Sequence, residues 1–269
     1  MTIRIPIAAI ALALAASTAA AGGAPERPSE TWEVIRGELW PGAEVADGDS
    51  VIDIDAPVRA QDAAIVPVRI SMNPQDDRRI TEMTLIVEEN PAPIAATFSF
   101  SDRMGRDIEL STRLRVDAYS NVRVVATLDD GSLIEAARFV KASGGCSAPA
   151  LKDADAALAA LGKMKLRHFE SDQISSDLAE AQVMIRHPNN SGFQMDQVTL
   201  LTIPAFFVDS MAVTVDGDRL FEMEGGISLS EDPAIRFTYP RRSAAEIEVR
   251  ATDTDGGLYA KRFAVDTQS

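Results

Sequence analysis

The sequence is poor in the residues that most often catalyse reactions or bind metals. Its 269 residues include one cysteine, Cys146, and two histidines, His168 and His187. One cysteine and two scattered histidines do not supply the ligands of a tightly held metal site. The sequence also lacks a phosphate-binding loop, a G-x-S-x-G motif and an H-E-x-x-H motif. We therefore predict no catalytic constellation, no metal and no resident cofactor.

Basic residues and long apolar runs are scarce as well. The chain has 26 basic and 41 acidic residues, for a formal charge of −15. This acidity disfavours nucleic acid and anionic membranes as partners, and is compatible with basic protein partners. The apolar run from Ile5 to Ala16 is too short to span a bilayer. Together with Arg4 before it and Ala19-Ala20-Ala21 after it, this run predicts a signal peptide over residues 1–21. We expect a periplasmic chain with no membrane association after cleavage.

Two stretches of the chain repeat each other. Residues 124–133 (VVATLDDGSL) resemble residues 249–258 (VRATDTDGGL), and the match extends to Val140 against Val265 at one constant offset. Each copy is typical of a strand, an Asp-Gly turn and a second strand. Residues 83–87 and 211–215 form a weaker match at nearly the same offset. The repeats predict two copies of one antiparallel β domain.

Short alternating segments in both halves support a mainly β fold. They predict strands at 51–54, 65–72, 83–87, 96–100, 110–116, 122–128, 181–185, 211–215, 226–229, 235–239, 247–251 and 258–265. This spacing is typical of one β-sandwich per half. Apolar spacing also predicts a helix from Thr31 to Trp40, and a linker helix from Ala150 to about Lys165 that lies against a sandwich by its leucine face. The predicted domains are a first sandwich with its N-terminal helix at 29–142, a cysteine loop and linker helix at 143–165, and a second sandwich at 166–269.

Aspartates gather in turns such as 47–49, 129–131, 216–218 and 253–256. None of these turns carries the full calcium-binding loop with its later glutamate. Hairpin turns use Asp and Gly for backbone reasons alone, so we interpret these segments as turns.

Cys146 lies in a stretch of small residues, Ser143-Gly144-Gly145-Cys146-Ser147-Ala148-Pro149. A lone cysteine in an exported protein is either an intermolecular partner or a free thiol. Since glycines have no side chain to pack, the composition predicts a flexible loop that exposes the thiol to water. If the thiol were instead buried in a hydrophobic interior, it could not deliver a bound group, and only a scaffold function would remain.

These residues resemble a known family. Gly144-Gly145-Cys146 after a β-sandwich resembles the Gly-Gly-Cys tail of the sulfur carrier subunit SoxY. In the second half, segments that resemble its partner SoxZ are the His-Pro turn from Ile185 to Phe193, Val215 to Phe221, Ser230 to Phe237 and Ala251 to Lys261. The order of these segments resembles that of fused SoxYZ-like carriers associated with quinoprotein (PQQ) dehydrogenases. The resemblance covers nearly all of the mature chain.

The resemblance implies a periplasmic carrier and not an enzyme. Cys146 would hold a covalent sulfur adduct, Gly144 and Gly145 would be its flexible neck, and redox enzymes or cytochromes would be the partners. Two immunoglobulin-like sandwiches packed on each other would replace a heterodimer. One departure is that the family arm is a free chain end, whereas here the chain continues through Ser147-Ala148-Pro149. A loop tied at both ends reaches less far, and the cargo stays open between a sulfur species and a group linked to alcohol oxidation.

Two other functions stay open at this stage. The chain is alternatively a non-covalent accessory module for a periplasmic quinoprotein alcohol dehydrogenase system, since sandwiches are common binding scaffolds. A thiol enzyme with His168 or His187 as the base of Cys146 is the third reading. It ranks last, because no oxyanion-stabilising group or acid is found near the cysteine in the sequence.

Overall fold

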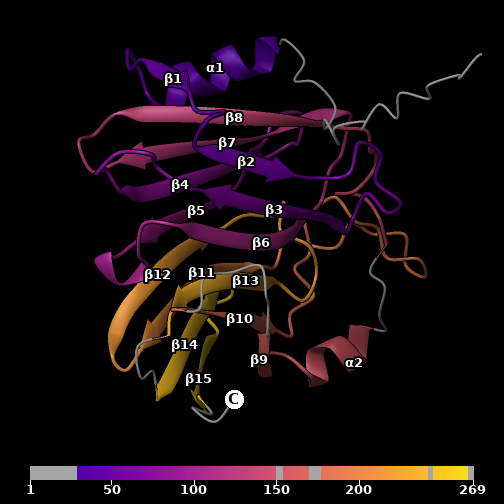
Figure 1. Ribbon diagram of the computed structural model, residues 1–269. Helices are drawn as coiled ribbons and strands as arrows, with labels where there is room; N and C mark the ends of the chain where they lie inside the picture. The colour runs from indigo at the N-terminus through magenta and orange to yellow at the C-terminus, as the bar shows by residue number, and fades with distance from the viewer. Residues whose placement is uncertain (1–28, 150–153, 170–176, 242–244, 266–269) are drawn as a thin grey trace, which may run out of the picture.

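The computed structural model describes residues 29–149, 154–169, 177–241 and 245–265 (Figure 1). The predicted signal peptide lies outside the described residues. No helix in the described ranges is long and apolar enough to cross a membrane.

The described chain folds into two β-sheets that face each other across one core. The nine-stranded sheet has the order β1 (Val45–Asp47), β8 (Leu133–Val140), β7 (Ser120–Leu128), β4 (Ile80–Val87), β5 (Ile94–Phe100), β12 (Asp218–Gly225), β11 (Val208–Val215), β14 (Glu246–Asp253) and β15 (Leu258–Ala264). The six-stranded sheet has the order β2 (Ile52–Asp55), β3 (Val66–Met72), β6 (Ile108–Leu114), β13 (Ala234–Pro240), β10 (Leu178–Ile185) and β9 (Met164–Phe169). The fold is the mainly β, two-sandwich class predicted from the sequence.

The strand order shows how the two halves are related. Strands β8-β7-β4-β5 of the first half continue into β12-β11-β14-β15 of the second, so the repeated hairpins β7–β8 and β14–β15 lie on opposite sides of the junction. The six-stranded sheet has the same arrangement, with β2-β3-β6 followed by β13-β10-β9. The halves are thus arranged about an approximate two-fold axis, as in an isologous dimer.

The halves join edge to edge, and this differs from the expected stacking of one sandwich on the other. Strand β5 pairs with β12 from Phe100 opposite Phe221 to Ala96 opposite Gly225, and β6 pairs with β13 at Leu110 opposite Phe237. Edge strands leave backbone N–H and C=O groups unpaired, and pairing between the halves satisfies those groups. The chain therefore forms continuous sheets in which each half covers an edge of the other.

The hydrophobic core is also shared by the halves. One cluster of buried side chains includes Phe98 from β5 together with Phe221 and Phe237 from the second half. The ring of Phe221 lies 6.0 Å from that of Phe98 and 5.1 Å from that of Phe237. Aromatic contacts of this kind stabilise a fold beyond the burial of their area. Neither half therefore has a complete hydrophobic core of its own.

The first predicted helix is observed within a residue of its expected bounds. Helix α1 (Glu30–Leu39) is capped by Ser29, whose side chain accepts a hydrogen bond from the Trp32 backbone N–H at 3.1 Å. Such an N-cap supplies a partner for one of the free N–H groups of the first turn. Trp32 and Ile35 pack on the outer face of the nine-stranded sheet, against Ile86, Val125 and Leu133.

The predicted linker helix is shorter than expected. Helix α2 (Ala154–Ala159) ends before Gly162, which has a φ of +72°, and the chain then enters β9 at Met164. Residues 150–153 lie outside the described residues. Met164 is buried opposite Ile185 of β10, and this sheet contact overrides the helical preference of the sequence. Leu158 is 54% exposed, so the predicted packing by a leucine face is wrong at this position.

The predicted strand at 226–229 is also wrong. Gly226 lies in the connection between β12 and β13, and its N–H donates to the Ala95 carbonyl at 2.9 Å. A Cβ at Gly226 would lie 2.7 Å from the Ile94 carbonyl oxygen. The glycine is needed for the close approach of two backbones and not for a strand.

Candidate functional site at the junction of the two halves

Cys146 lies in a turn after β8, and its side chain is 0% exposed. The expected water-exposed thiol on a pliable loop is therefore wrong for this conformation. Gly144 N–H donates to the Asp117 carbonyl at 2.7 Å and Gly145 N–H to the Val116 carbonyl at 3.1 Å. The Cys146 N–H donates to the Asp117 side chain at 3.1 Å. These bonds dock residues 144–146 on the segment that follows β6.

Gly144 and Gly145 have a packing role, whereas the sequence predicted only a flexible neck. A Cβ at Gly145 would lie 2.2 Å from the Ala63 carbonyl oxygen and 2.7 Å from both the N and O atoms of Val116. Only glycine permits such an approach between backbones. Gly144 has a φ of +78°, which glycine adopts without strain. In the docked conformation, both glycines fit a specific turn.

The second half supplies the other wall of this site. The Ser191 hydroxyl donates to the Cys146 carbonyl, and the Gln194 side-chain amide donates to the Ala148 carbonyl at 3.0 Å. Ser191 is 2% exposed and Gln194 is 0% exposed. We call Ser191 and Gln194 the latch, because they hold the cysteine segment from the opposite half. Ser147 and Pro149, which flank the latched carbonyls, are exposed, so the segment lies just beneath the surface.

A buried arginine lies beneath the segment. Arg115 is 2% exposed, and its guanidinium donates to the Gly145 carbonyl at 3.4 Å and to the Asn189 carbonyl at 3.2 Å. Its Nε has no hydrogen-bond partner among the described residues. Burial lowers the pKa of Arg115, whereas Cys146, Glu231 and Asp62 act in the opposite direction. The site thus contains a buried cation close to the thiol.

Two buried asparagines position this arginine and its neighbours. The Asn90 side chain donates to the Arg115 carbonyl at 2.7 Å and to the Ser228 hydroxyl at 2.8 Å, and accepts from the Asp117 N–H at 2.8 Å. Asn189, with a φ of 48°, donates to the Leu229 carbonyl and accepts from the Val208 N–H. Polar groups from both halves therefore form one network around the cysteine segment.

The thiol is fully buried in the docked conformation. Among the described residues, Cys146 belongs to neither of the two clusters of buried apolar side chains. Burial raises its pKa to about 11, the Asp117 carboxylate adds to the increase, and Arg115 opposes it. Since the thiolate is the nucleophile, the docked cysteine is unreactive near neutral pH. Sulfur chemistry on Cys146 needs the segment to open.

We expect the alkylation rate of Cys146 to depend on pH in an unusual way. The rate constant for iodoacetamide should rise about tenfold per pH unit from pH 7 to pH 10 without levelling, because a raised pKa keeps the thiol protonated throughout this range. The measurement is mass-spectrometric labelling, with free glutathione as the control that levels near its own pKa. A plateau near pH 8 to 9 would show that the thiol is already exposed.

The histidines do not form a catalytic pair with this cysteine. His187 is 1% exposed; its Nδ1 accepts from the Asn189 N–H at 3.0 Å, and its Nε2 lies 3.4 Å from Asp253 Oδ2. Burial lowers its pKa, which favours the neutral ring. Nδ1 therefore supports the His-Pro turn that carries Asn189 and Ser191, and Nε2 faces the Asp253 carboxylate at the end of β14. His168 lies on edge strand β9 opposite Ala181, three strands from β6 in the six-stranded sheet.

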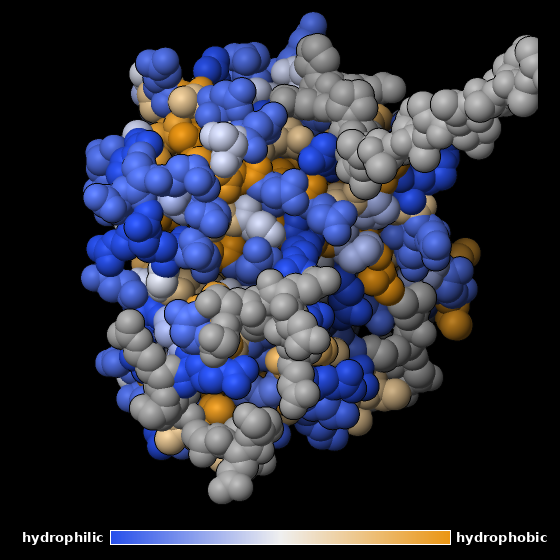
Figure 2. Space-filling model, in the orientation of Figure 1, coloured by the Kyte–Doolittle hydropathy of each residue, from blue (hydrophilic) through white to orange (hydrophobic). Residues whose placement is uncertain are grey.

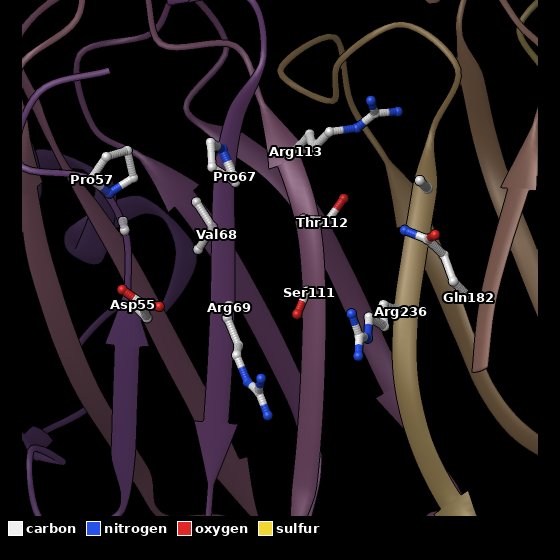
Figure 3. Close-up of a pocket in the computed structure, with 12 residues that line it drawn as sticks. Asp55, Pro57, Pro67, Val68, Arg69, Ser111, Thr112, Arg113, Gln182 and Arg236 are labelled. Carbon is white, nitrogen blue, oxygen red and sulfur yellow. The ribbon is translucent and has the colours of Figure 1, made fainter. Parts of the chain in front are cut away.

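A second hollow crosses the junction on the outer face of the six-stranded sheet. Its volume is about 530 Å³, and Figure 3 shows Arg69, Arg113 and Arg236 around it. Arg69 binds Glu109 at 2.9 Å, and Arg236 binds Glu180 through two contacts of 2.6 Å. Ligand pockets are mostly apolar, whereas about half of this lining is polar and these two cations are already paired. The cysteine segment is the stronger candidate site.

Sequence reasoning found only part of the site. It identified Cys146, both glycines and the His-Pro turn, and the structure brings these together. It missed Asn90, Arg115, Asp117 and Gln194, which are single polar residues in loops without a motif. Within the described residues, no three side chains of His, Cys, Asp or Glu are grouped as metal ligands.

Comparisons with known proteins match each half separately. Residues 37–146 match the family model described as sulfur oxidation protein SoxY, and residues 167–264 match the model described as sulphur oxidation protein SoxZ. The chain has no match among curated proteins.

Among solved structures, the chain is similar to the sulfur carrier protein SoxY from Chlorobium limicola f thiosulfatophilum, at 24% identity and a TM-score of 0.34. That match covers 42% of this chain and 91% of the other. A superoxide reductase (neelaredoxin) from Ignicoccus hospitalis matches at 18% identity and a TM-score of 0.29, over 34% of this chain and 79% of its own.

Proposed function

Because the chain belongs to the fused SoxYZ-like family, with a SoxY domain followed by a SoxZ domain, we propose that it is a periplasmic carrier that binds a sulfur intermediate covalently on Cys146. The observation that carries this proposal is the position of Cys146, which is the last residue of the SoxY match and lies on the wall formed by the SoxZ half. The predicted signal peptide supports the periplasmic location. The fusion replaces a heterodimer, as the shared core and paired edges of the two halves indicate.

The chemistry that Cys146 would perform is simple. With thiosulfate, a bond forms between the Cys146 sulfur and the terminal sulfur of the anion, the thiol loses one proton, and two electrons pass to a redox protein such as a cytochrome. The product is a cysteine thiosulfonate with one negative charge. The buried Arg115 guanidinium would favour such an anion over the neutral thiol. Other sulfur species would bind through the same atom.

The docked conformation is then the resting form of the carrier. A thiol that is exposed in an oxidising compartment is open to oxidation and to mixed disulfides. Burial and a raised pKa protect Cys146 until the latch opens. Since the segment is tied at both ends, it would be presented as a short loop and would enter only shallow sites.

Loading of the cysteine tests this function. We expect the wild-type protein to gain the mass of one thiosulfonate group when it is incubated with thiosulfate and periplasmic extract of the source organism, because the extract supplies the electron acceptor. Intact-mass spectrometry measures the gain, and Cys146→Ser should show none. A wild-type protein that stays unmodified after every such incubation would contradict the proposal.

A non-covalent accessory role for a quinoprotein (PQQ) alcohol dehydrogenase system is the second candidate. The closed, protonated thiol of the docked state favours it, because binding alone does not require Cys146 to react. The same Cys146→Ser variant separates the two functions. Full partner binding and full pathway activity in this variant would favour the accessory role, whereas loss of activity with retained binding supports the carrier.

A further inference from the structure

A loop beside the cysteine segment presents large apolar side chains to water. Within residues 193–203 the exposed fractions are 50% for Phe193, 51% for Met195, 91% for Val198, and 68% for both Leu200 and Leu201. This stretch, which we call the apolar loop, protrudes at the right of Figure 1, and apolar atoms stand out at the same edge in Figure 2. Contiguous exposed apolar patches on soluble proteins mark interaction sites.

The apolar loop is held in one conformation by its own hydrogen bonds. The Asp196 side chain accepts from the backbone N–H groups of Val198 at 3.0 Å and Thr199 at 2.6 Å, and the Asp196 N–H donates to the Leu201 carbonyl at 2.9 Å. The Ile203 N–H donates to the Gln194 carbonyl at 2.9 Å and closes the base. A loop that is ordered before binding loses less entropy on binding.

The backbone at Leu200 is strained. Leu200 has a φ of +58°, a region where glycine or asparagine is accommodated at lower cost. Its side chain is 68% exposed, so burial in the fold does not offset this cost. Strained residues of this kind cluster at functional sites. An exposed leucine held at this position is explained if a partner buries it.

The charge of the loop indicates the chemistry of its partner. Asp196 is the one charged residue in residues 193–203 of a chain whose formal charge is −15, and its carboxylate is occupied by Thr199 and Val198. A basic partner would find little to attract it here, so the complementary surface is apolar and uncharged. The net charge also disfavours approach to an anionic bilayer.

The apolar loop and the latch belong to one stretch of chain. Gln194, which binds the Ala148 carbonyl, lies between Phe193 and Met195, and the Ser191 hydroxyl that binds the Cys146 carbonyl accepts from the Phe193 N–H at 3.2 Å. Movement of Phe193 or Met195 on binding would disturb both latch bonds. A partner seated on the loop would therefore lie beside Cys146 as its segment opens.

We propose that the apolar loop is the docking surface for the protein that loads Cys146, and that this protein presents an apolar, uncharged recess to it. The proposal rests on the carrier function described above. A second copy of the chain and a lipid surface are the competing occupants, and the experiment is designed to separate all three.

The test compares assisted with unassisted loading. In the loop variant, Val198→Ser with Leu201→Ser, loading of Cys146 from thiosulfate and periplasmic extract should fall at least tenfold. Tetrathionate needs no partner, because the Cys146 thiolate attacks one of its central sulfur atoms and displaces thiosulfate, so its rate should be unchanged. The matched control carries Val34→Ser and Leu258→Ser, which are 61% and 83% exposed elsewhere on the fold, and should load normally.

Three outcomes would overturn the docking proposal. The first is assisted loading of the loop variant at the wild-type rate. The second is a photoreactive benzoylphenylalanine at Val198 that cross-links only to a second copy of the chain. The third is co-sedimentation of the wild type with phosphatidylcholine vesicles that the loop variant loses. If wild-type Cys146 takes up no sulfur from thiosulfate and extract, the carrier function itself fails and the docking proposal falls with it.

Discussion

Replacing Gly145 by alanine is expected to accelerate the alkylation of Cys146 by roughly 10- to 100-fold at neutral pH. The added Cβ would lie 2.2 Å from the Ala63 carbonyl oxygen and 2.7 Å from two backbone atoms of Val116, so no side-chain rotation relieves the clash. Overpacking of this kind costs about 1–3 kcal/mol. Because the same residues dock and protect the thiol, that cost is paid by the docked conformation and shifts the segment toward the open one.

The measurement is the second-order rate constant for iodoacetamide, followed by mass spectrometry at pH 7.5. Gly37→Ala is the matched control, because Gly37 lies in α1 and nothing lies within 4 Å of its added Cβ. The thermal midpoint of each variant shows whether the fold itself has changed. Labelling of Gly145→Ala at the wild-type rate, with an unchanged midpoint, would mean that the docked segment does not protect the thiol.

The same glycine shows where sequence reasoning fails. A Gly-Gly pair before a lone cysteine suggests freedom, because composition records what a residue permits and not what lies against it. The burial of Cys146 depends on Asp117, Ser191 and Gln194, which are distant from it in sequence. No local pattern predicts such contacts. The chemistry-bearing residue was identifiable from sequence, but its environment was not.

The fold was more predictable than the site. Alternation located most strands, and the repeated hairpins indicated the internal duplication, since both signals depend on local turn and side-chain periodicity. Strand β12 was missed, and it is one of the two strands of the second half that pair across the junction, β12 with β5 and β13 with β6. Its sequence, DRLFEMEG, is rich in charge and does not alternate strictly. The edge-to-edge pairing of the two halves was therefore not predicted, and one sandwich was expected to stack on the other.

A second large effect is expected at the base of α1, where Arg123 is buried between two carboxylates. Its guanidinium donates to Glu88 at 2.7 Å and to Glu135 at 2.6 Å, and lies 4.4 Å from the ring centroid of Trp32. Arg123 is 2% exposed and Glu88 is 1% exposed. Removing one partner of a buried ion pair leaves an uncompensated charge, which typically costs about 3–5 kcal/mol.

We therefore expect Arg123→Met to lower the free energy of unfolding by about 3–5 kcal/mol, measured by urea denaturation with far-UV circular dichroism, which reports on the strands of both halves. Arg78→Met is the matched control, because Arg78 forms a 2.7 Å ion pair with Asp76 at the surface, where such pairs contribute about 0–1 kcal/mol. Adding Glu88→Leu to Arg123→Met should recover part of the loss, since the buried charge is then removed. Equal losses in Arg123→Met and Arg78→Met would contradict this account. Because one core spans both halves, the loss should appear in a single unfolding transition and not in the first half alone.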